Sequence, residues 1–457
     1  MQAKPDSVPS PEAARGGYAP AIPVIGVVLL LIFALLYQFN YDLYLRVLDY
    51  LIDGVWRFPF LDWIYVPAQI QCWQQGVDVY AATPCDPLNR PMDYSPLWLR
   101  LSFIPTGKEA VAWSGLGLDL SFIASTGFLL GSRRSVEFVV VALATYSSAT
   151  ILALERANVD AVMFVLAVVA ALCLERTLAV RIAGYCAILL AGFLKFYPFA
   201  MLTMLLRERL TVCVALGLAA TALLISFALV YLDELVRILP NVPRWSYFEP
   251  NVWGAARLPG GIGQALQAFT QAAGFGGEWF DEFGSTKMLE RVAGLALLLV
   301  LLASSLRLAK SSTISSALDA LPNRSANFLV LSAALTCGCF FAGQSARYRA
   351  IVMLLSLPGL LALARDGQPL VNRLVFSSAV IAVLLVVWQP LLLHIGGNVL
   401  GYSLRPVTHG PATGYAFWLV QELACWLIAA ILTTVLFWFV LRSPIALRRF
   451  ARRKSPP

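Results

Sequence analysis

The feature that most constrains this chain is its series of apolar runs, many of them near 20 residues long, separated by short polar loops. An apolar run of that length spans the hydrocarbon core of a bilayer as an α-helix. The composition agrees, because 59% of the 457 residues are hydrophobic and 13% are charged, whereas about a quarter are charged in soluble domains. The alternating short segments of a membrane barrel are not seen. The sequence therefore predicts an all-α polytopic membrane protein.

A single transmembrane domain is expected over residues 21–441. A polar, Pro/Ala-rich segment, 1–20, precedes it and is expected to be disordered, and a basic tail, 442–457, follows it. The first apolar run has no clear small-residue cleavage site and is interpreted as a retained span rather than a signal peptide. The expected spans are 21–38, 109–130, 136–153, 159–175, 182–194, 197–206, 211–231, 288–306, 327–342, 350–364, 374–394 and 414–441.

The placement of basic residues predicts the orientation. "GSRRS" (131–135), "RERL" (207–210) and the tail "LRRFARRKSPP" are basic, and such loops stay cytoplasmic. These basic segments lie on the same side of the membrane only if the run 182–206 breaks at Lys195–Pro198 and returns as two half-length helices. Proline favours such a break. Both termini are then cytoplasmic in the plasma membrane, and the large loops 39–108 and 232–286 lie outside. Contact with anionic membrane lipids explains the basic tail better than nucleic-acid binding does.

Two of the eight cysteines, Cys72 and Cys85, share the first outer loop. On an oxidising side of the membrane they can form a disulfide, and the alternative is two free thiols. The outer carboxylates have no clear metal-ligand spacing. No cofactor or metal is therefore predicted, and a requirement for a divalent metal stays open.

Charged side chains in or beside membrane spans are costly and indicate function, and here they gather on the predicted outer side. A carboxylate such as Asp62 can take a proton from an acceptor hydroxyl. The simpler alternatives are that Asp62 caps a helix starting at Trp63, that the lysine of the broken run reaches to the interface, and that the arginines are ordinary loop charges. The cations that suit a lipid-linked phosphate are Lys195, Arg156, Arg347 and Arg349.

Four stretches together resemble glycosyltransferase family 87. "LDWIYVPAQIQCWQQGVDVY" (61–80) is similar to the first-loop pattern of that family, in which an Asp leads a Tyr, small residues, a Gly and a closing Tyr. "ERANVDAV" (155–162) resembles its Asn-x-Asp element, and "AGFLKFYP" (191–198) its Gly…Lys-x-Tyr-Pro element. "ARYRAIVMLLSLPGLL" (346–361) is a weaker match to a later span. The chain departs from the pattern at Ser95, where a Tyr-Pro-Pro type of element is expected.

The resemblance implies a GT-C membrane glycosyltransferase, a bundle of about 11–12 transmembrane helices with a broken helical hairpin and large outer loops. Such an enzyme transfers a sugar, here a hexose such as mannose, from a polyprenyl-phosphate donor to a lipid or glycan acceptor on the outer face. By position in the motif, Asp62 is the general base. The resemblance also implies that the site is lined by Asn158, Asp160, Tyr197 and Tyr65.

Three other functions stay open. A transporter or flippase of lipid-linked sugars also uses intramembrane cations and broken helices, although the sequence shows no inverted repeat. An O-antigen polymerase or ligase carries an Arg-rich outer loop, and loop 232–286 contains Arg237, Arg244 and Arg257. A scaffold without catalytic activity is the last alternative. No nucleic-acid-binding motif is present.

Overall fold

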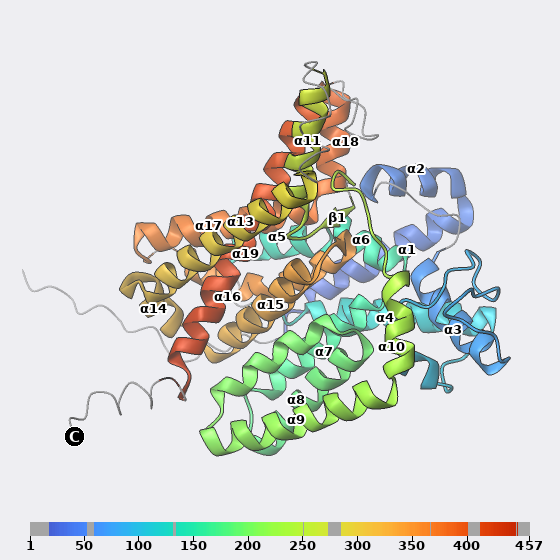
Figure 1. The fold of residues 1–457 in the computed structure, drawn as a ribbon, viewed down its shortest axis with the longest axis horizontal. Coiled ribbons are helices and arrows are strands. Elements are labelled where there is room, and N and C mark those ends of the chain that lie inside the picture. Colours follow the sequence, from blue (N-terminus) through green and yellow to red (C-terminus); the bar gives the residue numbers. More distant parts are fainter. Residues whose placement is uncertain are drawn as a thin grey trace, which may run out of the picture.

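The computed structural model describes residues 18–52, 59–130, 134–249, 251–272, 285–365, 367–400, 412–444 and 446. Most of the expected terminal segments, 1–20 and 442–457, lies outside these residues. Within them the regular structure is helical apart from one short two-stranded ladder (Figure 1). In that ladder β1 (Val252–Trp253) pairs antiparallel with β2 (Ser345–Ala346). The all-α prediction is confirmed.

The N-terminal half builds the part of the molecule that carries most of the predicted site. Its apolar runs begin and end near the expected boundaries, since long apolar stretches without proline favour continuous helices. The helices are α1 (Ala21–Phe39), α2 (Tyr41–Ile52), α3 (Leu61–Gln74), the 3-10 helix η2 (Pro96–Arg100), α4 (Lys108–Thr126), α5 (Ser135–Thr145), α6 (Ser148–Glu155), α7 (Asp160–Cys173), α8 (Leu178–Leu194) and the 3-10 helix η3 (Tyr197–Arg207).

The C-terminal half packs around α15, which is the most deeply buried of the long apolar helices. The 3-10 helices η3 and η5 both lie against α15. The elements are α9 (Leu210–Val230), α10 (Leu232–Ile238), η4 (Leu239–Asn241), α11 (Arg257–Ala272), α13 (Ser285–Lys310), α14 (Ser312–Asp319), α15 (Asn323–Ala342), η5 (Arg347–Ser356), α16 (Leu357–Leu363), α17 (Leu370–Val387), α18 (Gln389–Leu400) and α19 (Ala412–Arg442).

Fewer helices of the described residues than the expected 11–12 are long and apolar enough to cross a membrane by themselves. Six helices of the described residues are long and apolar enough to cross a membrane, or seven if the bent pair α5–α6 is one span. The pair bends by 45° in the run expected as one span, 136–153. The run 374–394 is divided between α17 and α18, and 197–206 and much of 350–364 are 3-10 helices. At 14 residues, α7 is about 21 Å long, shorter than a hydrocarbon core of about 30 Å.

The chain turns back on itself at Lys195. That residue is extended (φ −153°, ψ 117°) and ends α8, and η3 then runs antiparallel to α8. Arg181 near the start of α8 forms a two-point ion pair with Glu208 after η3, with N–O distances of 2.7 and 2.8 Å. Gly192 allows the turn to close, because a Cβ at this position would lie 2.2 Å from the Phe199 ring. The second arm, expected as a half-length helix, is the 3-10 helix η3.

The loops gather into two groups, and members of each group contact one another. The loops expected outside meet where Arg100 pairs with Glu234 at 2.9 Å and the Asn241 amide donates to the Tyr80 carbonyl at 2.9 Å. The loops expected inside meet where Arg442 pairs with Asp319 and Arg365 pairs with Glu137. Both of the large loops expected outside contain helices: α2, α3 and η2 in one, and α10, η4 and α11 in the other (Figure 1).

Candidate functional site

The start of α3 is fastened to the turn between α6 and α7. The amide of Phe60 donates to the Glu155 carbonyl at 2.7 Å, and the amides of Asp62 and Trp63 both donate to the Arg156 carbonyl at 3.2 and 3.1 Å. Asp62 therefore lies against the "ERANVDAV" stretch although almost a hundred residues separate them. It is the second residue of α3 rather than its cap, since Phe60 precedes the helix and no side chain caps it.

Asp62 is a buried carboxyl group with two polar neighbours. The Asn158 amide donates to Asp62 Oδ2 at 2.6 Å, and Arg90 Nη1 lies 3.5 Å from Oδ1. Only 6% of the residue is exposed. The carboxyl is thus oriented by one hydrogen bond and faces an opposite charge, which is how a proton-accepting group is held in place.

Asp160 is the meeting point of three donors. It accepts from Lys195 Nζ at 2.8 Å and from the Tyr197 hydroxyl at 2.7 Å, and Arg349 Nε lies 3.5 Å from Oδ2. Its own amide donates to Asn158 Oδ1 at 2.9 Å, so Asn158 links it to Asp62. Two cations share one carboxylate here. Asp160 by itself balances only one of these two positive charges, and an ammonium and a guanidinium have donors to spare.

Tyrosines and a further carboxyl surround these charges. Lys195 Nζ lies 5.0 Å from the centre of the Tyr94 ring and 5.9 Å from that of Tyr348. The Tyr65 hydroxyl donates to Asp93 at 2.8 Å. Burial raises the pKa of the Asp93 carboxyl, while its hydrogen bond with Tyr65 and the nearby cations act in the opposite direction. We call the group of Asp62, Arg90, Asp93, Tyr94, Asn158, Asp160, Lys195, Tyr197, Tyr348 and Arg349 the polar centre.

Left-handed backbone accompanies the polar centre. Among the described residues three non-glycine positions have positive φ: Phe60 (61°), Asn89 (50°) and Ala157 (42°). Each lies within two residues of Asp62, Arg90 or Asn158. This conformation costs roughly 1 kcal/mol or more for a residue with a Cβ. Unfavourable backbone of this kind persists where the surrounding structure holds functional side chains in place.

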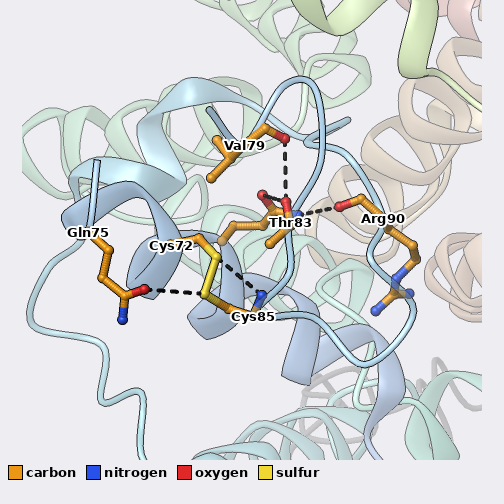
Figure 2. The surroundings of a disulfide bond; sticks show 7 residues. Cys72, Gln75, Val79, Thr83, Cys85 and Arg90 are labelled. Carbon is orange, nitrogen blue, oxygen red and sulfur yellow. Dashed lines mark hydrogen bonds between the residues drawn. A yellow bond between two sulfur atoms is a disulfide. The ribbon is translucent and has the colours of Figure 1, made fainter. Parts of the chain in front are cut away.

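A disulfide and several hydrogen bonds shape the loop that supplies Arg90, Asp93 and Tyr94. In the structure Cys72 and Cys85 are joined, with their Cα atoms 5.8 Å apart. Figure 2 shows this bond beside Thr83, whose hydroxyl contacts the Val79 carbonyl at 3.4 Å. The buried Gln69 amide donates to the Arg90 carbonyl at 2.9 Å. Farther along, the Trp98 indole donates to the Leu194 carbonyl at 3.0 Å, which ties this loop to the turn that carries Lys195.

Two of the predicted cations do not join the polar centre. Arg347 is fully buried elsewhere: its Nη2 donates to the Val252 carbonyl at 2.7 Å. It begins η5, and because successive residues of a 3-10 helix are about 120° apart, residues 347 and 349 cannot face the same neighbour. Arg156 contributes its backbone carbonyl to Asp62, but its Nε lies 3.9 Å from Glu155.

Arg347 instead lies near a second set of buried charges. Arg257 Nη1 lies 3.4 Å from Glu422, with both side chains fully buried. The Arg257 guanidinium also donates twice to the Tyr247 carbonyl, at 2.9 and 2.7 Å. The Trp418 indole donates to the same carbonyl at 3.0 Å. We call Arg257, Arg347 and Glu422 the buried anchor, because they hold the loop before α11 against β2 and α19.

Sequence reasoning missed four members of the site: Arg90, Asp93, Tyr94 and Tyr348. The signal for the first three was the stretch "NRPMDYSPLW", in which they accompany prolines. The sequence analysis used that stretch only for Ser95, which departs from the family pattern. No group of three or more metal-ligating side chains occurs in the part of the chain that the structure describes.

Comparison with known proteins adds no relative: no family model, curated protein or solved structure matches this chain. Function must therefore be argued from the polar centre itself. Its geometry offers one oriented carboxyl group, Asp62, for proton transfer. Linked to it through Asn158 and Asp160 are two cations, Lys195 and Arg349, whose remaining donors can hold an anion.

Proposed function

We propose that this protein is a membrane glycosyltransferase that transfers a sugar, a hexose such as mannose, from a polyprenyl-phosphate donor to a hydroxyl of a lipid or glycan acceptor. The observation that carries the proposal is the bridge through Asn158. It holds the Asp62 carboxyl next to a carboxylate, Asp160, that two cations share. Proton acceptor and anion-holding cations are the two parts that this transfer needs.

In the proposed reaction the acceptor hydroxyl oxygen attacks the anomeric carbon of the donor sugar, and Asp62 takes the hydroxyl proton. A bond forms between the anomeric carbon and the acceptor oxygen as the bond from that carbon to the phosphate oxygen breaks. The electron pair of the broken bond leaves with the polyprenyl phosphate, whose negative charge grows. Lys195 and Arg349 stabilise this growing charge, which lowers the barrier more than it strengthens substrate binding.

The grouping of the loops supports an active site on the extracytoplasmic side of the plasma membrane. Every segment of the polar centre belongs to the loops and turns expected outside. The basic loops expected inside contact one another instead, as in the pair between Arg442 and Asp319. The positive-inside rule then leaves both termini in the cytoplasm. A GT-C arrangement with the turn at Lys195 reaching the outer side is the corresponding proposal for the fold.

The direct test is transfer by the purified protein in lipid vesicles. Vesicles are supplied with polyprenyl-phosphate hexoses and with acceptor lipids, and the glycosylated product is followed by mass spectrometry. In Asp62→Asn we expect the transfer rate to fall by about 10²–10⁴-fold, the usual contribution of a general base. Donor binding should be retained, because the cations are unchanged.

A matched control is Asp78→Asn, which alters an exposed carboxylate of the same loop and should leave transfer unchanged. Wild-type transfer by Asp62→Asn would exclude this residue as the base. Movement of the donor across the vesicle membrane without any glycosylated product would favour the transporter instead.

A further inference from the structure

A large cavity lies on the other side of α3 from Asp62. Its volume is about 930 Å³, at the upper end of the range for sites that enclose small ligands. Side chains of α1, α2, α3, α4 and α6 line it, and most are aliphatic or aromatic, such as Leu30, Phe33 and Trp113. Phe60 and Ile64 face this cavity while Asp62 is not part of its wall. The cavity is therefore separate from the polar centre.

Two carboxyl groups interrupt this apolar wall. Asp119 on α4 is fully buried, and neither of its oxygens has a hydrogen-bond partner among the described residues. Glu155 at the end of α6 is 8% exposed, and its oxygens likewise lack hydrogen bonds; Arg156 Nε lies 3.9 Å from one of them. Buried carboxyl groups without partners are rare in native structures because they are costly, and they call for an explanation.

The surroundings of these carboxyl groups restrict what can satisfy them. No lysine or arginine is among the lining residues that the structure describes, and the guanidinium of Arg156, outside the lining, already faces Glu155. A phosphate head would therefore meet two acidic groups and no cation of its own. An ammonium head would require ionised carboxylates inside an apolar wall, where desolvation is expensive. A hydroxyl can donate a hydrogen bond to a carboxyl oxygen and accept one from a protonated carboxyl.

We propose that this cavity binds a lipid alcohol: an apolar chain that fills the space between α1 and α4, with an uncharged hydroxyl head at Asp119 and Glu155. The occupant differs from the donor expected at the polar centre, whose head is a phosphate. Binding here does not depend on any transfer reaction. The inference therefore goes beyond the proposed function and can fail or hold independently of it.

Photolabelling of the full-length protein in nanodiscs tests the site. The probe is a long-chain alcohol with a diazirine in the chain, and labelled peptides are located by mass spectrometry. We expect labels on α1 and α4, and we expect the unlabelled alcohol to compete at least about tenfold better than the amine or the phosphate monoester of the same chain, since two hydrogen bonds favour it. Equal or better competition by either charged lipid would overturn the assignment of the head group.

Two variants of α4 make the test specific. Ala112→Trp adds bulk to the cavity wall and should abolish labelling, whereas Leu120→Trp changes an exposed residue of the same helix outside the wall and should not. Asp119→Leu should weaken binding of the alcohol about tenfold. Labelling of α1 that persists in Ala112→Trp would show that the alcohol lies elsewhere, whatever the transferase activity of the protein.

Discussion

The polar centre and the buried anchor both place arginine and carboxylate side chains out of water, yet they use them differently. In the anchor, the Arg257 guanidinium ends on Glu422 and on the Tyr247 carbonyl, and Arg347 donates to the Val252 carbonyl. In the polar centre, Lys195 and Arg349 converge on the same Asp160 and are bordered by tyrosine rings. The arginines of the anchor donate mainly to backbone carbonyls, whereas the two cations of the centre share one carboxylate, which leaves donors for another molecule.

The backbone differs in the same direction. None of the three non-glycine residues with positive φ in the described ranges lies in the anchor, and all three lie beside the polar centre. Charged side chains that only stabilise the fold need a partner of opposite charge or a hydrogen bond. The backbone around them can therefore keep favourable, negative φ angles. Side chains that must meet a ligand have to be presented in one geometry, and the surrounding structure then maintains unfavourable backbone to do so. The comparison predicts that variants of the anchor change stability and that variants of the centre change ligand binding.

The largest expected effect is on the stability of the anchor. Arg257→Met leaves Glu422 as a buried carboxylate without its partner, and breaking such a pair costs about 3–5 kcal/mol of the free energy of unfolding. Unfolding of the detergent-solubilised protein, followed by loss of helical circular dichroism, measures this. The double variant Arg257→Met/Glu422→Gln should recover most of the loss because the unpaired charge is gone. An Arg257→Met protein as stable as the wild type would show that the anchor is not structural.

The disulfide comes next, because it holds the loop that delivers Arg90 and Asp93 to the polar centre. The two cysteines are 13 positions apart in the sequence. Replacing both by serine opens the loop that the disulfide closes, which lowers the free energy of unfolding by about 3 kcal/mol in the chain-entropy treatment. We expect faster hydrogen exchange over residues 76–95 with little change at the buried anchor. Reduction of the wild type should have the same effect. Unchanged exchange in this loop would mean that its hydrogen bonds alone fix its shape.

A smaller effect, and one on binding rather than stability, is expected for Lys195→Met. Asp160 keeps Tyr197 and Arg349 as partners, so the fold should tolerate the loss, while one cation at the anion site disappears. Loss of a charged hydrogen bond costs about 1.5–3 kcal/mol, equal to roughly 10–150-fold in the Kd of a polyprenyl-phosphate sugar.

Arg244→Met is the matched control, since Arg244 is an exposed cation of loop 232–286, the other loop expected outside. It should leave the Kd unchanged at physiological salt. If both variants weaken binding equally, the donor responds to the general positive charge of this side rather than to the polar centre.

Sequence reasoning predicted the fold class and chose residues from distant segments that the structure brings together: Asp62, Asn158, Asp160, Lys195, Tyr197 and Arg349. The charged positions among them follow from the cost of placing a charge in or beside an apolar run, which can be read without coordinates, whereas Asn158 and Tyr197 were expected only from the resemblance to the family motifs. The separation of residue 347 from 349 could not be predicted, since it depends on the 3-10 geometry of η5. Arg90 also escaped prediction, because loop shape follows from a disulfide and single hydrogen bonds rather than from a periodic pattern. The cavity at Asp119 arises only from packing.

The smallest expected effect concerns the backbone beside the polar centre. Ala157 is fully buried with φ of 42°, and glycine adopts this conformation without the cost that a Cβ brings, although it loses more entropy on folding. The two contributions nearly cancel, so Ala157→Gly should change the free energy of unfolding by no more than about 0.5 kcal/mol. Ala153→Gly, at an equally buried position within α6, has no such compensation and should lose about 1 kcal/mol. If the two variants lose the same amount, the backbone at residue 157 is not under strain, and the contrast with the buried anchor would then rest on side-chain contacts alone.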